Sequence, residues 1–370
     1  MTSTTLPNTG GPLSAQGVPV QWAVLVVLSG GLAFLFEAAK IPAALLIGPM
    51  VGGILVAVGG GSIRVPKTPF FGAQGILGCM IAGAISFEIL VAFAADWPLF
   101  VGVVVSVVAA SSLLGWMMSR WQVLPGTTAV WGSSPGAATA MMLMAGAFGA
   151  DQRLVAFMQY LRVLFVALAA SLVARFWVGV SGSAAPGIDW FPAVDWLRLG
   201  ETLALAWGAA WLGAALRIPA GPLLLPLAIG AGLHVAGLID FFLPEWLLAA
   251  SYALIGWNIG LGFNRPILVY AAKALPKIVA SIIALLAFCA AIAWLLTKTV
   301  GVDPLTAYLA TSPGGMDSVA IIAASTKVDL SFVMALQTAR FLIVLLAGPS
   351  LARLIARQVG VKDGQERPQG

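Results

Sequence analysis

The feature that most constrains this chain is a series of apolar segments joined by very short connections. Each segment is long enough to cross about 30 Å of hydrocarbon, which takes about 20 residues of helix. Of the 370 residues, 60% are hydrophobic and only 9% are charged, whereas soluble domains carry about 25% charged residues. The sequence therefore predicts an all-α polytopic membrane protein. The predicted segments are 20–39, 41–60, 70–94, 97–118, 124–150, 152–178, 196–216, 219–238, 246–263, 275–297, 303–326 and 330–352.

Few parts of the chain lie outside these segments. The N-terminal tail has no Lys or Arg, so it lacks the charged region of a secretory signal, and we expect the first apolar segment to be retained as a helix. Nowhere is there room for a soluble catalytic or DNA-binding domain. The predicted organisation is a polar tail 1–17, a first membrane repeat 18–178, a linker 179–195, a second membrane repeat 196–357 and a cytoplasmic tail 358–370.

The second group of six segments repeats the first. Ser312-Pro313-Gly314 lies 178 positions after Ser134-Pro135-Gly136, and Asp329, Gln337 and Arg340 lie at the same offset from Asp151, Gln159 and Arg162. Several matches in one register indicate an internal duplication.

The charges of the connections indicate that the two repeats are inverted. Arg64 and Lys67 follow the second segment, whereas the equivalent connection of the second repeat carries Asp240 and Glu245. Cytoplasmic loops are enriched in Lys and Arg, so equivalent loops should lie on opposite sides of the membrane. Inversion requires an odd number of crossings per repeat. We therefore expect about ten transmembrane helices plus two special segments, with both termini cytoplasmic in a bacterial inner membrane.

The special segments are the fifth and the eleventh, each interrupted by Ser-Pro-Gly. Proline removes an amide donor and glycine lets the chain bend, so these segments are either re-entrant hairpins or broken crossing helices. Irregular backbone at membrane depth is typical of transporter binding sites; a packing kink is the plainer alternative. The predicted substrate-binding residues at the breaks are Ser134, Pro135, Gly136, Thr311, Ser312, Pro313, Gly314 and Gly315.

Two arginines in the following helices complete the predicted site. Arg162 and Arg340 lie ten or more residues inside apolar segments, where a charge costs on the order of 2.5–3.5 kcal/mol. Gln159 and Gln337 share their helix faces, three residues earlier. The arginines either bind solute or hold the carbonyl groups of the breaks. Asp151 and Asp329 are interpreted mainly as helix caps.

One acidic residue distinguishes the second break from the first. Asp317 follows Ser-Pro-Gly, where the first repeat has Thr139. A lone carboxylate at this depth is a candidate for proton or sodium coupling, with a salt bridge to an arginine as the alternative.

The repeated Ile-Pro-Ala opening, the Ser-Pro-Gly breaks and the Gln-x-x-Arg helices together resemble the AbrB-duplication family of bacterial inner-membrane proteins, over about residues 20–355. That family is similar to the cation–proton antiporter and anion transporter superfamily. The resemblance implies a core and a scaffold domain, and frequently a homodimer. The family also carries two other labels, a regulator of gene expression and an ammonia monooxygenase.

The residue types argue against an enzyme. One His and two distant Cys residues cannot build an oxygenase metal site, so we expect no catalytic residues, metal or cofactor. Although the net charge is +5, there is no basic module that would bind nucleic acid. The expected partners are the lipid bilayer and a small-molecule solute. The leading hypothesis is a secondary transporter or exporter of a small anionic or zwitterionic metabolite. The alternative is a non-transporting membrane regulator that affects gene expression indirectly.

Overall fold

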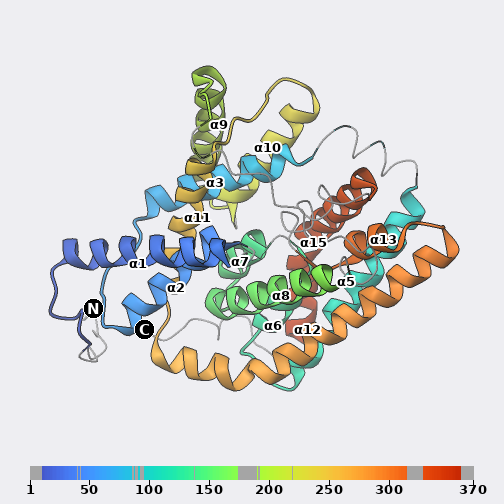
Figure 1. Cartoon of the computed structure of the whole chain (residues 1–370), viewed down its shortest axis with the longest axis horizontal. Coiled ribbons are helices and arrows are strands. Elements are labelled where there is room, and N and C mark those ends of the chain that lie inside the picture. The colour runs from blue at the N-terminus through green and yellow to red at the C-terminus, as the bar shows by residue number, and fades with distance from the viewer. Residues whose placement is uncertain are drawn as a thin grey trace. The chain divides into compact units, whose positions relative to one another are not determined.

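In a computed structural model of the chain, the regular elements of the described residues are all helices (Figure 1). The structure describes residues 11–39, 41, 43–85, 87, 91, 96–136, 138–173, 190, 192–218, 220–314 and 328–359. Each of the predicted apolar segments overlaps at least one of these helices, which confirms the predicted all-α fold class for the described residues.

The chain divides into two compact units. The first comprises residues 1–83, 189–272 and 364–370, and the second comprises 84–188 and 273–363. Each unit therefore draws on both of the predicted repeats. One boundary, between positions 188 and 189, falls within the predicted linker 179–195. Another falls within the helix Arg265–Thr299, between Ala272 and Lys273.

The first unit contains the opening helices of each repeat. Several of these helices carry proline at the second or sixth position of the helix. The backbone just before the second helix of each predicted repeat is left-handed, at Ala43 (φ 56°) and Ala220 (φ 53°). The helices are α1 Val18–Ala38, α2 Ala44–Val58, α3 Lys67–Gly83, α9 Trp196–Ala215, α10 Gly221–Val235 and α11 Glu245–Gly260.

Helices of the first unit pack through glycines, in pairs taken from different repeats. A Cβ on Gly256 of α11 would lie 2.7 Å from the Leu46 carbonyl oxygen of α2, and one turn later Gly260 adjoins Gly53. Because both sets of residue numbers rise together, α2 and α11 run parallel. Small residues permit such close backbone approach.

The other cross-repeat pair in this unit has the same geometry. A Cβ on Gly78 of α3 would lie 2.6 Å from the Leu223 carbonyl oxygen of α10, and Ala82 meets Gly230 further along. Helices α3 and α10 are therefore parallel as well. The second helix of each repeat consequently runs alongside the third helix of the other repeat.

The connections agree with this pairing. Ile63, which follows α2, belongs to one buried cluster with Leu261, which follows α11. Phe241, which follows α10, packs at Gly83, where α3 ends. In each case the loop after a second helix lies at the same end as the loop after the third helix of the other repeat.

The second unit contains the interrupted helices. Its described elements are α5 Trp97–Arg120, α6 Thr128–Ser133, α7 Ala138–Ala147, α8 Gln152–Val173, α13 Pro304–Thr311, α15 Leu330–Val359 and most of α12 Arg265–Thr299. Helix α8 packs on α6 and α7, and α15 packs on α13, α5 and α6. Val107 of α5 forms a buried cluster with Leu285 and Cys289 of α12.

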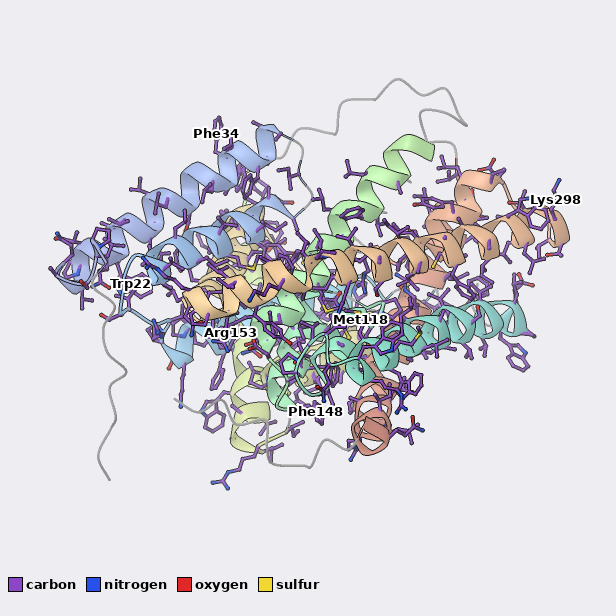
Figure 2. The ribbon with its side chains drawn as sticks, turned by 90° about the horizontal axis from the view of Figure 1, so that it is seen from below. Trp22, Phe34, Met118, Phe148, Arg153 and Lys298 are labelled. Carbon is purple, nitrogen blue, oxygen red and sulfur yellow. The ribbon has the colours of Figure 1, made fainter. Side chains whose placement is uncertain are left out.

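Apolar side chains cover much of the outside while polar ones lie inside. Phe34 is 75% exposed on α1 and projects away from that helix (Figure 2), whereas Gln21 and Ser29 of α1 are buried. Four described helices are long and apolar enough to span a membrane: Val18–Ala38, Trp97–Arg120, Arg265–Thr299 and Phe332–Ile355. A surface of this kind is solvated by lipid, which supports insertion in a membrane.

Two helices are longer than the sequence predicted. Helix α12 begins at Arg265, ten residues before the predicted segment, and ends near Lys298 (Figure 2). Lys273, which precedes the predicted segment 275–297, therefore lies on this helix together with Lys277. Helix α15 continues to Val359 and so passes the predicted end of the second repeat at residue 357. Both helices contain proline, at Pro276 and Pro349, without ending there.

Candidate functional site

Both Ser-Pro-Gly sequences interrupt helices in the second unit. Helix α6 ends at Ser133 and α7 begins at Ala138, while α13 ends at Thr311. Ser134 (φ −60°, ψ 124°) and Ser312 (φ −58°, ψ 135°) have nearly the same extended backbone. A residue that precedes proline avoids the helical region for steric reasons, which explains why each helix stops at this serine. Each break leaves the last carbonyl groups of a short helix without helical partners.

In the first break, two side chains of α8 bind these carbonyl groups. Gln159 Nε2 donates to the carbonyl oxygens of Trp131 (2.9 Å) and Ser134 (3.0 Å). Arg162 Nη1 donates to those of Ser134 (2.9 Å) and Ser133 (3.1 Å), and its Nη2 donates to Gln159 Oε1 (2.5 Å). Gln159 and Arg162 are only 0% and 2% exposed.

In the second break, α15 supplies the equivalent contacts. Gln337 Nε2 donates to the carbonyl oxygens of Leu309 (2.7 Å) and Ser312 (3.2 Å). Arg340 Nη1 donates to Ser312 (2.6 Å), with Thr311 at 3.5 Å, and Nη2 donates to Gln337 Oε1. Every one of these partners lies 178 positions after its counterpart in the first break.

One hydrogen bond joins the two breaks directly. Arg340 Nε donates to the Pro135 carbonyl oxygen at 2.8 Å, while Nη2 donates to that of Gly314 at 3.4 Å. The structure thus brings together Ser134, Pro135, Gln159 and Arg162 of the first repeat with Ser312, Gly314, Gln337 and Arg340 of the second. Gly136 and Pro313 are buried within the same breaks.

The charge of each arginine faces the carboxyl end of a short helix. Such an end carries a partial negative charge of about half a unit, so α6 and α13 stabilise their guanidinium groups in part. Neither Arg162 nor Arg340 forms an ion pair with a carboxylate of the described residues. A positive charge remains at these buried groups, and an anion could compensate it.

The hydroxyl groups of the breaks mostly bond to their own helices. Ser134 Oγ donates to the Val130 carbonyl oxygen (2.8 Å), Ser312 Oγ to that of Leu309 (3.1 Å), and Thr311 Oγ1 lies 2.9 Å from that of Ala307. Their protons are therefore engaged, although each oxygen can still accept a hydrogen bond. In this arrangement the hydroxyls can accept a hydrogen bond from a solute but cannot donate one without giving up a helix carbonyl.

Asp151 and Asp329 are helix caps, as predicted. Asp151 Oδ1 accepts from the backbone amides of Arg153 (3.0 Å) and Leu154 (3.4 Å), and Asp329 Oδ1 accepts from Phe332 (2.9 Å). The Asp151 carboxylate also pairs with the Arg153 side chain, with 2.9 Å between Nη2 and Oδ2.

Sequence reasoning missed three supporting residues. Thr128 Oγ1 accepts from the Asp151 amide (3.2 Å) and Thr306 Oγ1 from the Asp329 amide (3.3 Å), so the start of each long helix is tied to the short helix before it. Ser133, the last helical residue before the first break, is the third. The 178-residue offset from the predicted Thr311 could have revealed Ser133, and the same offset relates Thr128 to Thr306.

Two predicted site residues, Gly315 and Asp317, lie outside the described residues. The described residues include no group of three or more His, Cys, Asp and Glu side chains that could hold a metal ion. His234 lies in the first unit, where its Nδ1 is 3.1 Å from the Ile239 carbonyl oxygen.

Apolar helices long enough to span a membrane, together with interrupted helices held by buried arginines, are features of a polytopic membrane protein. A family described as "Transition state regulatory protein AbrB" matches residues 45–356. A protein of Escherichia coli (strain K12) named "Putative regulator AbrB" is 49% identical over 338 residues, covering 91% of this chain and 97% of its own length. "Uncharacterized protein YhjN" of Bacillus subtilis (strain 168) is 26% identical over 305 residues, covering 78% and 79%. No solved structure matches the chain.

The chain therefore belongs to the AbrB family, which confirms the family that its motifs indicated.

Proposed function

We propose that the protein is a secondary transporter or exporter of a small anionic or zwitterionic metabolite across a bacterial inner membrane. The observation that carries the proposal is the pair of buried arginines at two adjoining helix breaks, Arg162 and Arg340, without a described carboxylate beside them. A buried cation in a membrane protein must meet a partner, water or a ligand. Broken helices near the midplane are where secondary transporters bind their solutes.

We further infer that the two repeats are inverted in the membrane. The parallel pairs α2 with α11 and α3 with α10 support this, because the second helix of one repeat then runs in the direction of the third helix of the other. If all these helices cross, repeats of equal orientation would make both pairs antiparallel. Inverted repeats around a shared site permit the alternating access that transport requires.

Coupling to a proton or sodium gradient is assigned to Asp317. The basis is the sequence alone, since this carboxylate follows the second break and has no counterpart in the first. A carboxylate at this depth can take up a proton or bind a cation as the solute moves. We also propose cytoplasmic termini, a homodimer, and the absence of any catalytic activity, cofactor or nucleic-acid partner.

The second candidate function is a membrane regulator that does not transport. It is favoured by the description of the family as a regulatory protein and by the name of the Escherichia coli relative. Such a protein would bind the same solute without carrying it across the membrane. It would signal the bound state to a second protein, which in turn would alter gene expression.

One experiment separates the two functions. The purified protein is first screened for thermal stabilisation by small carboxylates and amino acids, and each stabilising compound is then tested for uptake into liposomes that contain the protein. Accumulation above protein-free liposomes, with exchange of labelled for unlabelled solute, is expected of a transporter. Stabilisation without any uptake or exchange would reject transport and favour the regulator.

A further inference from the structure

We propose that the two arginines have unequal roles: Arg162, together with Ser133, receives a carboxylate of the solute, whereas Arg340 is a positioning residue that holds the two breaks together. This inference rests on the proposed function, and it names the residues and the solute group that the site would use. It divides two positions that the sequence presents as equivalent.

The guanidinium of Arg340 has no donor left for a solute. Arginine has five N–H groups in a planar fork. Nε bonds to the Pro135 carbonyl, Nη1 to Ser312 with Thr311 beside it, and Nη2 to Gly314 and Gln337. A solute could bind this group only by displacing a carbonyl of a break.

The guanidinium of Arg162 is used differently. Its Nη1 and Nη2 hold the Ser133 and Ser134 carbonyls and Gln159, but its Nε has no hydrogen-bond partner among the described residues. This donor is buried, since Arg162 is 2% exposed. An unbonded buried donor is unfavourable and calls for a partner. Nε and Nη2 share the edge that Arg340 turns toward Pro135 and Gly314, and this edge fits the two oxygens of a carboxylate.

A second unbonded donor lies at the same break. Ser133 Oγ has no hydrogen-bond partner among the described residues, and Ser133 is 5% exposed. Its counterpart Thr311 is bonded to Ala307 and lies 3.2 Å from the Cys289 carbonyl oxygen. The arginine Nε and the hydroxyl of the last helical residue are therefore both hydrogen-bonded in the second break, whereas both lack a described partner in the first. Because Arg162 binds the Ser133 carbonyl, the two donors belong to one local cluster.

The surroundings of the first break favour a carboxylate over a phosphate. A Cβ on Gly136 would lie 3.1 Å from the Met141 side chain, and Gly132 lies directly against Met158. The thioether side chains of Met141 and Met158 cannot donate hydrogen bonds to the additional charged oxygens of a phosphate, and burying those oxygens without donors would be costly. A carboxylate presents only two oxygens, and Arg162 and Ser133 can satisfy both.

The test uses the full chain purified in detergent, with sodium acetate as the probe. The unfolding midpoint is measured against acetate concentration at constant ionic strength, with sodium chloride as the balancing salt and sodium phosphate as a separate series. A ligand that binds the folded state raises the midpoint in a saturable way, which gives an apparent Kd. Three variants are compared: Arg162→Lys, Ser133→Ala and the matched control Arg340→Lys.

We expect a saturable response to acetate in the unchanged protein. Lysine keeps the charge but lacks the planar fork, so Arg162→Lys should weaken the apparent affinity about tenfold or more. Ser133→Ala removes one donor and should weaken it about threefold or more. Because Ser133 Oγ has no hydrogen-bond partner among the described residues, Ser133→Ala should fold normally. This variant can therefore test the carboxylate site even if Arg162→Lys does not fold. Arg340→Lys should lower the starting midpoint while changing the affinity less than about threefold.

Several results would overturn the inference. These are no saturable acetate response in the unchanged protein, a stronger response to phosphate than to acetate, or an affinity that depends on Arg340 and not on Arg162. The outcome is separable from that of the transport proposal. Acetate binding without liposome uptake of any carboxylate would reject transport alone, and solute uptake that is unchanged in Arg162→Lys would reject only this inference.

Discussion

The unequal bonding of the two arginines makes a quantitative prediction about stability. The matched pair Arg162→Gln and Arg340→Gln removes the same side chain from two sites that are equally buried, at 2% exposure. The relief of the desolvation cost of a guanidinium should therefore nearly cancel between the variants. What differs is the number of carbonyl groups that each change leaves without a partner.

The structure gives that difference directly. Loss of Arg340 leaves the Pro135, Gly314 and Thr311 carbonyls without the partner they have among the described residues, while Ser312 keeps Gln337. Loss of Arg162 leaves only Ser133, the counterpart of Thr311, in this state, because Ser134 keeps Gln159. The Arg340 change therefore leaves two more carbonyls without a partner, and each such buried carbonyl costs about 1–3 kcal/mol. Arg340→Gln should therefore be less stable than Arg162→Gln by about 2–6 kcal/mol.

The assay is equilibrium unfolding in mixed micelles, with an increasing mole fraction of a denaturing detergent and without added anions. Folded protein is followed by size-exclusion chromatography and by helical circular dichroism. Equal free energies of unfolding, or a lower value for Arg162→Gln, would show that Arg340 is not the main tie between the breaks. The reasoning about unequal roles would then be wrong at its structural step.

Three further predictions concern packing, topology and coupling. Gly260→Ala should destabilise the first unit by about 1–3 kcal/mol because the new methyl group meets the backbone of α2. Gly232→Ala, inside α10 with no neighbour within 4 Å, should leave stability unchanged or raise it by up to about 1 kcal/mol in the same assay, because alanine favours a helix more than glycine does. Reporters fused after Arg64 and after Asn264 should both read cytoplasmic, and readings on opposite sides would refute inverted repeats. Asp317→Asn should keep solute binding but lose the dependence of liposome uptake on a proton or sodium gradient, because an amide does not exchange a proton and binds cations weakly; uptake that still follows the gradient would exclude Asp317 as the coupling residue.

Much of the fold could be predicted because membrane helices obey two simple rules. Their length is set by the hydrocarbon layer and their ends by proline, glycine and polar residues, so segments such as 97–118 and 196–216 closely match α5 and α9. The same rules failed for α12. Proline inside a long helix need not end it when neighbours satisfy the freed backbone groups, and α12 runs from Arg265 through Pro276 without a break.

The family resemblance implies a core and a scaffold domain, but which helices form each of the two units could not be read from the sequence. Repeats are visible as matches along the chain, but compact units depend on which helices exchange close contacts. The glycines that make these contacts, such as Gly78 and Gly256, are two among 42 glycines. Only the positions of the facing carbonyl groups distinguish them from glycines with open space around them, such as Gly208.

The candidate site shows where the limit of sequence reasoning lies. The two Gln-x-x-Arg motifs are identical, so the sequence predicts equal roles for their arginines. The hydrogen bonds from Nη1 of each arginine to the serine carbonyl of its own break are indeed equivalent. If the repeats are inverted around one axis, as we propose, every contact should occur twice, yet Arg340 Nε donates to the Pro135 carbonyl while Arg162 Nε has no described partner. If a single solute occupies the site, perfect symmetry would offer it two equivalent half-sites, and one orientation could not be preferred. The asymmetry at Nε gives the solute one defined side to bind, so the departure from the repeat is the property that a site for one small anion requires.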